Sequence, residues 1–206
     1  MRHFRFKQWF LILGVVAASA SNSLCQKTED YRVYDAVIRE MFRGGVTQFD
    51  MNAKIDQIVI RDRTFSEYAR GIEKESWDHV KTQMRSLTDE TIAGYELARK
   101  NERTLTAKFD IAFKYQLITD KQLAEIFEIK NDYDKSFEYW DGFYKIYPNS
   151  AGYNSFSRVG YDKAGRYALV YFVNWCRTLC GTGTYLLVEK GQSGWVVKEG
   201  AGMWIS

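Results

Sequence analysis

The sequence predicts an α+β fold in which a helical N-terminal half packs on a C-terminal antiparallel β-meander. Three observations support this class. Apolar residues recur at helical spacing through much of the first 150 positions, the last third has apolar runs separated by Gly-containing turns, and 46% of the 206 residues are hydrophobic. With a single Pro and no internal repeat, nothing in the chain marks a linker. We therefore expect one α+β domain over residues 30–206.

The first twenty residues have the order of a signal peptide. Three basic residues lie within positions 2–7, residues 9–18 form an uninterrupted apolar run, and a small-x-small cleavage site ends at Ala20. The run is shorter than the ~18 residues of a spanning helix. We expect removal of residues 1–20, export to the periplasm or the cell exterior, a loose N-terminus over 21–29, and no membrane span in the mature chain.

Two alternatives to cleavage at this site are an uncleaved membrane anchor and a lipoprotein with its lipid on Cys25. The second is disfavoured by Leu24, because lipoprotein signals have a small residue directly before the modified cysteine. Removal of the signal would leave 26 basic residues against 26 acidic ones, so the mature chain is formally neutral. A nucleic-acid-binding surface needs a basic excess or stripe. We therefore expect no nucleic-acid partner.

The N-terminal half is expected to contain mainly helices. Helical spacing of apolar residues predicts a helix from Asp30 that ends at Gly44-Gly45, and a β-branched run predicts a strand over 55–61. The charged segment 64–101 predicts two or three helices, one of them beginning at Thr88 because two acidic residues follow it.

In the middle of the chain the spacing of apolar residues changes from helical to alternating. Strict alternation of apolar residues predicts one strand or a long extended segment over 105–117. Thr119 and Gln122 form a capping box at the start of a short helix. Aromatic residues at helical spacing predict a further helix over 137–147, which Pro148 ends.

Four short strands with tight turns predict the meander of the last third. The expected strands cover 156–159, 167–175, 185–189 and 195–197, followed by a final apolar piece at 203–205. Because Trp204 and Ile205 are large and apolar, we expect the last residues to lie in the core, with a bend or a bulge at 200–202 between two strand pieces.

Cys176 and Cys180 are predicted to form a disulfide. Four residues along a strand span about 13 Å, too far for a bridge, but the Gly-rich sequence after Cys180 indicates a turn that brings the two together. Free thiols and a redox or metal pair are the alternatives. A metal site needs more ligands than this pair and His79, the single His after the signal, so we expect no metal and no cofactor.

Several consecutive segments resemble a group of uncharacterised bacterial exported proteins of about this length. They are Trp140-Asp141-Gly142-Phe143-Tyr144, Tyr147-Pro148-Asn149-Ser150, Phe156-Ser157-Arg158-Val159-Gly160, Ala168-Leu169-Val170-Tyr171, Cys180-Gly181-Thr182-Gly183, Trp195-Val196-Val197 and Trp204-Ile205-Ser206. The resemblance is strong over 140–206 and weaker over 30–64. It implies export and a shared fold, and it carries no known activity.

The aromatic surplus between residues 133 and 161 is the most unusual feature of the composition. It is typical either of a core between helices and sheet or of a groove for a peptide, a glycan or an apolar ligand. Tyr, Trp and Arg are also the usual anchors of protein interfaces. The candidate binding residues are therefore Trp140, Tyr144, Arg158, Trp175 and Arg177, with binding expected near the loop between the two cysteines.

No catalytic residue is assigned. Adjacent acidic residues such as Asp89 and Glu90 are typical of helix starts, and the Ser within 191–194 lies in a hairpin turn rather than in a nucleophile elbow. The function that the sequence favours is a non-catalytic binding module of the bacterial cell envelope, with an envelope protein, a peptide or a glycan as partner. A secreted hydrolase that uses carboxylates or His79 is the alternative, and a purely structural envelope protein is the third possibility.

Overall fold

The computed structural model describes residues 28–45, 54–66, 76–127, 136–177 and 180–206. The predicted signal peptide, Cys25 and most of the predicted loose N-terminus lie outside these residues. The described chain combines helices with a seven-stranded mixed sheet, which confirms the α+β class. The strand order is β2-β1-β3-β5-β6-β7, and β4 pairs separately with β5.

The chain is helical over 28–41 and continues into the 3-10 turn η1, Arg43–Gly45. The elements that follow are β1 Gln57–Arg61, α2 Ser76–Gln83, α3 Asp89–Ala98, β2 Lys114–Ile118, α4 Asp120–Ile126, α5 Ser136–Ile146, β3 Ser150–Phe156, β4 Gly160–Tyr161, β5 Tyr167–Trp175, β6 Thr182–Gly191 and β7 Gly194–Ile205. Strands β5, β6 and β7 form the antiparallel meander.

The expectation of a helical N-terminal half packed on a separate C-terminal meander is not confirmed, because β1 from that half and β2 just after it belong to the same sheet as the meander. Strand β1 lies between β2 and β3 and is parallel to both. Parallel neighbours need long crossover connections. Helices α2 and α3 lie between β1 and β2 in the chain, and α4 and α5 lie between β2 and β3, so these helices occupy the two crossovers.

The segment 105–117 was expected to form one strand or a long extended segment; a strand over the whole range is wrong, since the strand paired with a neighbour is Lys114–Ile118. The alternation of apolar residues nevertheless identified side chains that are buried or partly buried. Leu105 and Phe109 are buried in the same cluster as helix 28–41, and Ile111 and Phe113 pack against it. The segment before β2 therefore lies along the core in an irregular conformation.

The first strand of the last third begins earlier than expected, at Ser150 rather than near Phe156. Its sequence is polar although the strand is buried. The polar side chains form hydrogen bonds inside the sheet, to one another and to the backbone. The buried amide of Asn154 donates to the carbonyl of Val59 at 2.9 Å, and Asn174 donates to the Asn154 side-chain oxygen at 3.0 Å. Satisfied in this way, such groups carry little desolvation cost.

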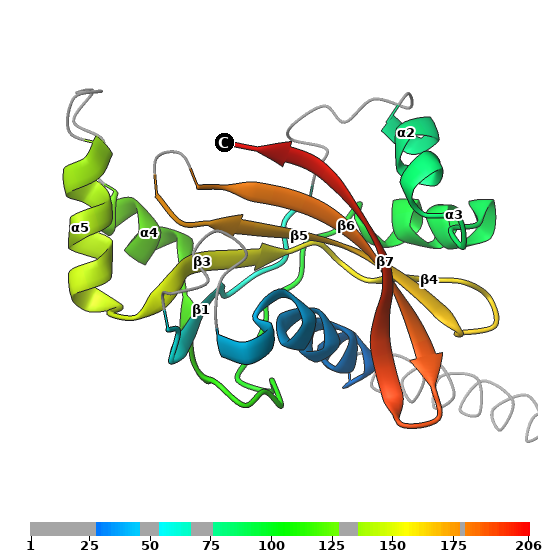
Figure 1. The fold of residues 1–206 in the computed structure, drawn as a ribbon, viewed down its shortest axis with the longest axis horizontal. Helices are drawn as coiled ribbons and strands as arrows, with labels where there is room; N and C mark the ends of the chain where they lie inside the picture. Colours follow the sequence, from blue (N-terminus) through cyan, green and yellow to red (C-terminus); the bar gives the residue numbers. More distant parts are fainter. Residues whose placement is uncertain (1–27, 46–53, 67–75, 128–135, 178–179) are drawn as a thin grey trace, which may run out of the picture.

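The sheet buries both of its faces. Successive strand residues point to opposite sides, so Val170 and Phe172 lie in one cluster with helix 28–41, whereas Leu169 and Tyr171 lie in another with α2 and α3. A third cluster contains Val59 and the aromatic residues of α5. Figure 1 shows helix 28–41 on one side of the sheet, with the α2–α3 and α4–α5 pairs towards its two ends.

Strand β7 is continuous, and its irregularities lie on either side of the bend expected at 200–202. The pairing with β6 shifts register where Lys198 and Met203 lie in β7. Such bulges bend a strand and increase its twist. They allow one long strand to follow the curved edge of the sheet from Gly194 to Ile205.

Candidate functional site

A cavity of about 170 Å³ opens on the sheet face opposite helix 28–41. We call it the sheet cleft. It is lined by Arg61, Phe65, Ser66, Glu102, Ser155, Val173 and Trp175. Trp175 packs against the α2–α3 cluster and also against the α5 cluster. The sheet cleft therefore lies where these two clusters meet.

Strand register places the base of the sheet cleft. Ser155 on β3 is paired with Val173 on β5, and Trp175 is two residues further along the same strand. Residues two apart in a strand share a face, so all three side chains lie on the cleft side. Phe65 is held beside them because its N–H donates to the carbonyl of Phe156 at 3.0 Å.

Arg61 is fixed at the rim by a bidentate ion pair. Its Nε donates to Asp120 Oδ1 at 2.5 Å and its Nη2 donates to Oδ2 at 2.9 Å. These hydrogen bonds lower the pKa of Asp120 and raise that of Arg61. Asp120 is the first residue of α4, whose start is set by the predicted capping box of Thr119 and Gln122. A forked pair of this kind orients the guanidinium more firmly than a single contact would.

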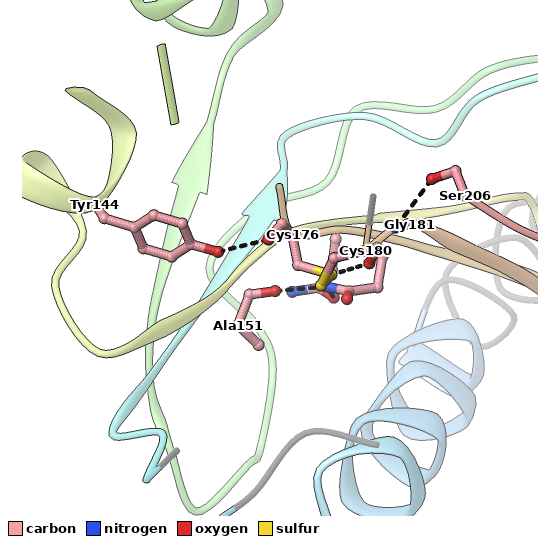
Figure 2. The surroundings of a disulfide bond; sticks show 8 residues. Tyr144, Ala151, Cys176, Cys180, Gly181 and Ser206 are labelled. Carbon is pink, nitrogen blue, oxygen red and sulfur yellow. Dashed lines mark hydrogen bonds between the residues drawn. A yellow bond between two sulfur atoms is a disulfide. The ribbon is translucent and has the colours of Figure 1, made fainter. Parts of the chain in front are cut away.

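The loop between Cys176 and Cys180 borders the same region. The two sulfur atoms are 2.14 Å apart, so the predicted disulfide pair is present. Figure 2 shows its surroundings: the Tyr144 hydroxyl donates to the carbonyl of Cys176 at 3.1 Å. Gly181 and Ser206 bond reciprocally, because the Gly181 N–H donates to Ser206 Oγ and the Ser206 N–H to the Gly181 carbonyl. The loop is thus anchored at both ends.

Arg177 lies over the ring of Tyr144, with its guanidinium carbon 5.0 Å from the ring centroid. Its backbone φ of 139° is a conformation that residues other than Gly rarely adopt. Burial raises the pKa of Tyr144, and the charge of Arg177 opposes that shift. The side chain of Arg177 is exposed, so a cationic group lies on an anchored loop beside the sheet cleft.

Four of the five candidate binding residues lie in one group. Trp140 stacks on Tyr153 at 6.1 Å, Tyr153 stacks on Trp175 at 6.5 Å, and Tyr144 is 5.9 Å from Trp140. Trp140 itself is 9% exposed, so it supports the group from the core. These side chains form one aromatic wall that reaches the sheet cleft at Trp175 and ends at Tyr144, under Arg177.

Arg158 lies elsewhere, in the environment of Asp30 and Tyr34 on the helix 28–41 side. Its Nε is buried and has no hydrogen-bond partner among the described residues. Sequence reasoning grouped Arg158 with the aromatics because it is close to them in the chain. It also missed Arg61 and Glu102, although a charged residue at the end of an apolar strand was the available signal for Arg61.

The hydrolase alternative named His79, the single His after the predicted signal. His79 is exposed on α2, and its Nε2 is 2.6 Å from the side-chain nitrogen of Gln83. Among the described residues, no group of three His, Cys, Asp or Glu side chains is placed to hold a metal ion. No helix in the same ranges is both long enough and apolar enough to cross a membrane.

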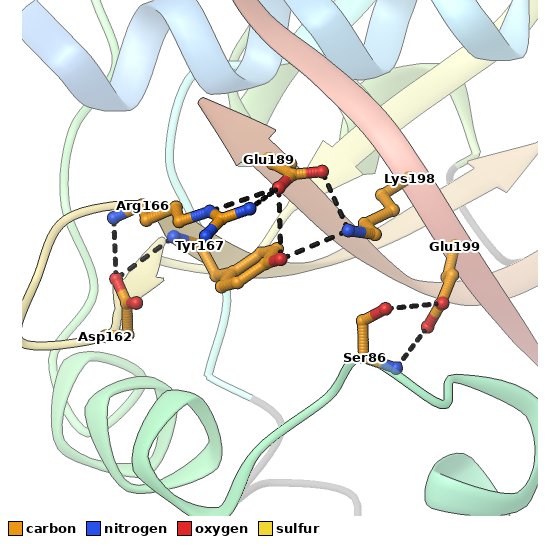
Figure 3. Close-up of polar contacts among 7 residues, drawn as sticks. All are labelled: Ser86, Asp162, Arg166, Tyr167, Glu189, Lys198 and Glu199. Atoms are coloured by element: carbon orange, nitrogen blue, oxygen red, sulfur yellow. Dashed lines mark hydrogen bonds and ion pairs between the residues drawn. The ribbon is translucent and has the colours of Figure 1, made fainter. Parts of the chain in front are cut away.

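A second polar cluster, at the far end of the meander, is built around Glu189 (Figure 3). Its carboxylate accepts hydrogen bonds from Lys198, Arg166 and Tyr167. These bonds lower the pKa of Glu189 to about 2. Nearby, Glu199 accepts from the N–H and the hydroxyl of Ser86 and so links α2–α3 to β7. The carboxylates bind other parts of the chain, and we assign the cluster to fastening the strands.

Loss of the disulfide should weaken the fold without abolishing it. A Cys176→Ser, Cys180→Ser double variant is expected to lose about 1–3 kcal/mol, because a four-residue loop constrains little of the unfolded chain. Thermal unfolding followed by circular dichroism should show a melting temperature lower by roughly 2–12 °C. Thiol labelling of non-reduced protein provides the control, and labelling of both cysteines would contradict the prediction.

Comparison with known proteins leaves the geometry as the only guide to function. No family model matches the chain, and neither a curated protein nor a solved structure matches it. The function must therefore be inferred from the chemistry of the sheet cleft and its surroundings.

Proposed function

We propose that this protein is an exported, non-catalytic binding module of the bacterial cell envelope, and that the sheet cleft receives one side chain of a protein or peptide partner. The observation that carries the proposal is the position of Trp175, which lines the cleft and lies next to an anchored loop. Trp and Arg are the residues most enriched among the anchors of protein interfaces.

The size of the sheet cleft favours a single side chain over a larger ligand. Its volume of about 170 Å³ is smaller than the ~300–1,000 Å³ of typical small-molecule pockets. Phe65, Val173 and Trp175 offer apolar surface, whereas Arg61 and Glu102 offer charge. This lining suits a side chain with an apolar stem and a polar end.

The cleft also has little conformational freedom to lose on binding. Arg61 is held by two hydrogen bonds to Asp120. Trp175 is held between Tyr153 at 6.5 Å and Trp204 at 5.0 Å. Pre-ordered contacts of this kind reduce the entropy that binding would otherwise cost. Rigidity at this position therefore supports a binding role.

Selection from a displayed random-peptide library tests the occupant. Peptides that bind the wild type should share one residue type. Their affinity should fall at least tenfold in Trp175→Ala and in Glu102→Lys, because both residues line the cleft. Glu125→Lys is the matched control, since Glu125 is exposed on α4 and pairs only with Lys121 in the described chain. Unchanged affinity in both cleft variants would contradict the proposal, and binding only to an arrayed glycan would replace the peptide as occupant.

The contribution of the disulfide loop is tested separately by Arg177→Ala. We expect a loss of affinity for the same peptides, because the exposed guanidinium lies at the end of the aromatic wall. Tyr144→Phe is the companion variant, as it removes the hydrogen bond to Cys176 and keeps the ring under Arg177. If folded Arg177→Ala retains wild-type affinity, the loop serves only to staple the hairpin.

Export is tested by the intact mass of protein recovered from outside the cytoplasm. Residues 1–20 should be absent, because the segment has the charged, apolar and small-residue order that signal peptidase recognises. A mass that includes residues 1–20 would contradict cleavage. A chain that begins at Cys25 and carries added lipid mass would establish the lipoprotein alternative instead.

A further inference from the structure

A second cavity, of about 290 Å³, lies on the other face of the sheet, beside helix 28–41. It is lined by Arg32, Asp35, Arg39, Asp110, Ser193, Gly194 and Trp195. Three of these residues come from one face of the helix, and three come from the β6–β7 hairpin, Ser193 from its turn and Gly194 and Trp195 from the start of β7. The cavity is separate from the sheet cleft and plays no part in the function proposed above.

Asp35 is the unusual residue of this cavity. It is 4% exposed, and its Oδ1 is buried without a hydrogen-bond partner among the described residues. The backbone N–H of Asp110 bonds to the carboxylate, but burial outweighs it and raises the pKa of Asp35 to about 6. At neutral pH most of the protein thus holds a buried carboxylate with one unsatisfied oxygen, which is costly unless a ligand supplies the missing donor.

Charged residues of both signs line the cavity, and along the helix an acidic residue lies between two basic ones. Asp35 lies one helical turn from Arg32 on one side and one turn from Arg39 on the other. Arg32 is engaged by Glu29 at 2.9 Å, whereas Arg39 forms no ion pair within the described part of the chain. Arg39 and Asp35 are therefore the neighbouring cation and anion with bonding capacity left.

We propose that this cavity binds a free α-amino acid, whose ammonium group pairs with Asp35 and whose carboxylate pairs with Arg39. The χ2 torsion of Asp is broad, so a small rotation turns the unsatisfied oxygen towards the ligand. Charged side chains at i and i+4 have Cβ atoms about 5–6 Å apart. Both side chains can therefore contact one small ligand that carries both charges.

Ligands with one kind of charge fit this cavity less well. A simple anion would face Asp35 and Asp110, and a simple cation would face Arg32 and Arg39. The volume lies near the lower limit for small-molecule pockets, about 300 Å³. Trp195 lines the cavity as well; its side chain is buried and lies under Lys190, so it forms part of the cavity wall.

Binding should also depend on pH in a defined direction. The ammonium group of the ligand needs an ionised Asp35, so affinity should fall as pH decreases through about 6. The other charged groups that face Asp35 are Arg32 and Arg39 from its own helix and Asp110 from the segment before β2. The β6–β7 hairpin contributes only neutral side chains to the cavity, those of Ser193 and Trp195.

The test uses the twenty proteinogenic α-amino acids as probes, with binding followed by amide chemical-shift changes and calorimetry. At least one should bind saturably, and its N-acetyl and amide derivatives, which each lack one charge, should bind at least tenfold more weakly. Asp35→Asn and Arg39→Gln should each weaken binding at least tenfold. Arg43→Gln is the matched control, because Arg43 is exposed and pairs with Glu40 outside the cavity.

Asp35→Asn also separates a binding role from a structural one. Asn keeps an acceptor for the Asp110 N–H and removes the buried charge, so the variant should melt at or above the wild-type temperature while it loses the ligand. If this variant does not fold, the test rests on the affinity of Arg39→Gln for the amino acid and on the affinities of the wild type for the N-acetyl and amide derivatives. The inference is overturned if no amino acid binds saturably, if the derivatives bind equally well, or if both variants retain wild-type affinity. Retained amino-acid binding in Trp175→Ala would show that the two sites are independent.

Discussion

Gly160→Ala is expected to destabilise the protein by about 3 kcal/mol, at the upper limit of typical overpacking effects. A Cβ at this position would lie 2.1 Å from the Cα and 2.2 Å from the N of Tyr95. Both are backbone atoms of α3, so no side-chain rotation can relieve the clash. The strand β4 and the helix α3 would have to separate, which would expose the fully buried ring of Tyr95.

Gly94→Ala provides a second test of the backbone contact between α3 and β4, because the expected change in stability is opposite to that of the same substitution in an ordinary helix. Replacing Gly with Ala inside a helix normally stabilises it by about 1 kcal/mol. Here the added Cβ would lie 2.0 Å from the carbonyl oxygen of Tyr161, so the substitution should be destabilising. Gly142→Ala in α5 is the matched control, because nothing lies within 4 Å of its Cβ position, and it should be neutral or stabilising.

Chemical unfolding of the three variants gives the measurement. We expect the midpoint to fall in Gly160→Ala and in Gly94→Ala and to stay level or rise in Gly142→Ala. A wild-type midpoint for Gly160→Ala would show that α3 and β4 are not in backbone contact. That result would also remove the support for the position of α3 on the sheet.

Features set by local chemistry could be predicted from the sequence. Thr88 caps α3, and its hydroxyl accepts the N–H of Thr91. Thr119 and Gln122 form the expected capping box. The strand predicted over 167–175 has the same bounds in the structure. In each case a side chain acts within a few residues, or a continuous apolar run is long enough to identify the strand.

Features that depend on distant partners could not be predicted. The strand predicted over 55–61 is present, but its parallel neighbours β2 and β3 lie about 60 and 95 residues further along the chain. Nothing in a single apolar run specifies a neighbour so far away. The start of β3 was missed for the same reason. Its polar residue Asn154 is typical of a loop, and its partner, the carbonyl of Val59, is distant in the chain.

The candidate site likewise contains some residues that the sequence predicted and others that only the structure reveals. Trp175 was identified because Trp beside Arg is a typical interface pair, and the structure places Trp175 in the sheet cleft. Glu102 joins it through the fold alone, and Arg61 joins it from the end of an apolar strand. Asp35 escaped notice because a single acidic residue in a helical pattern normally faces solvent, whereas here it is 4% exposed. Buried charge of this kind becomes visible only when the packing is known.

The last residues of the chain were expected in the core, and this is right for Trp204 and wrong for Ile205. Trp204 is partly buried, its ring lies 5.0 Å from that of Trp175, and its Nε1–H donates to the Tyr171 hydroxyl at 2.8 Å. Ile205 is 77% exposed. Adjacent residues of a strand point to opposite sides, so a terminal edge strand buries one of the two.

Deletion of residues 203–206 should therefore cost about 3–5 kcal/mol, the range measured for loss of a large aromatic side chain from a core. The deletion removes the Trp204 ring, its hydrogen bond to Tyr171 and the reciprocal bonds between Ser206 and Gly181. Trp204→Ala should account for most of the loss. Ile205→Ala should change stability by less than about 0.5 kcal/mol, as is usual for exposed positions.

Because Trp204 packs against Trp175, the deletion should affect the sheet cleft as well as the stability. Thermal unfolding measures the first effect, and affinity for a selected peptide at a temperature where the truncated protein remains folded measures the second. We expect both to fall, and we expect Ile205→Ala to leave both unchanged. A truncated protein with wild-type melting temperature would show that Trp204 contributes nothing to the core. One that is less stable but binds normally would show that Trp175 keeps its position without Trp204. The rigidity of the cleft would then rest on the contact of Trp175 with Tyr153 and on the ion pair between Arg61 and Asp120.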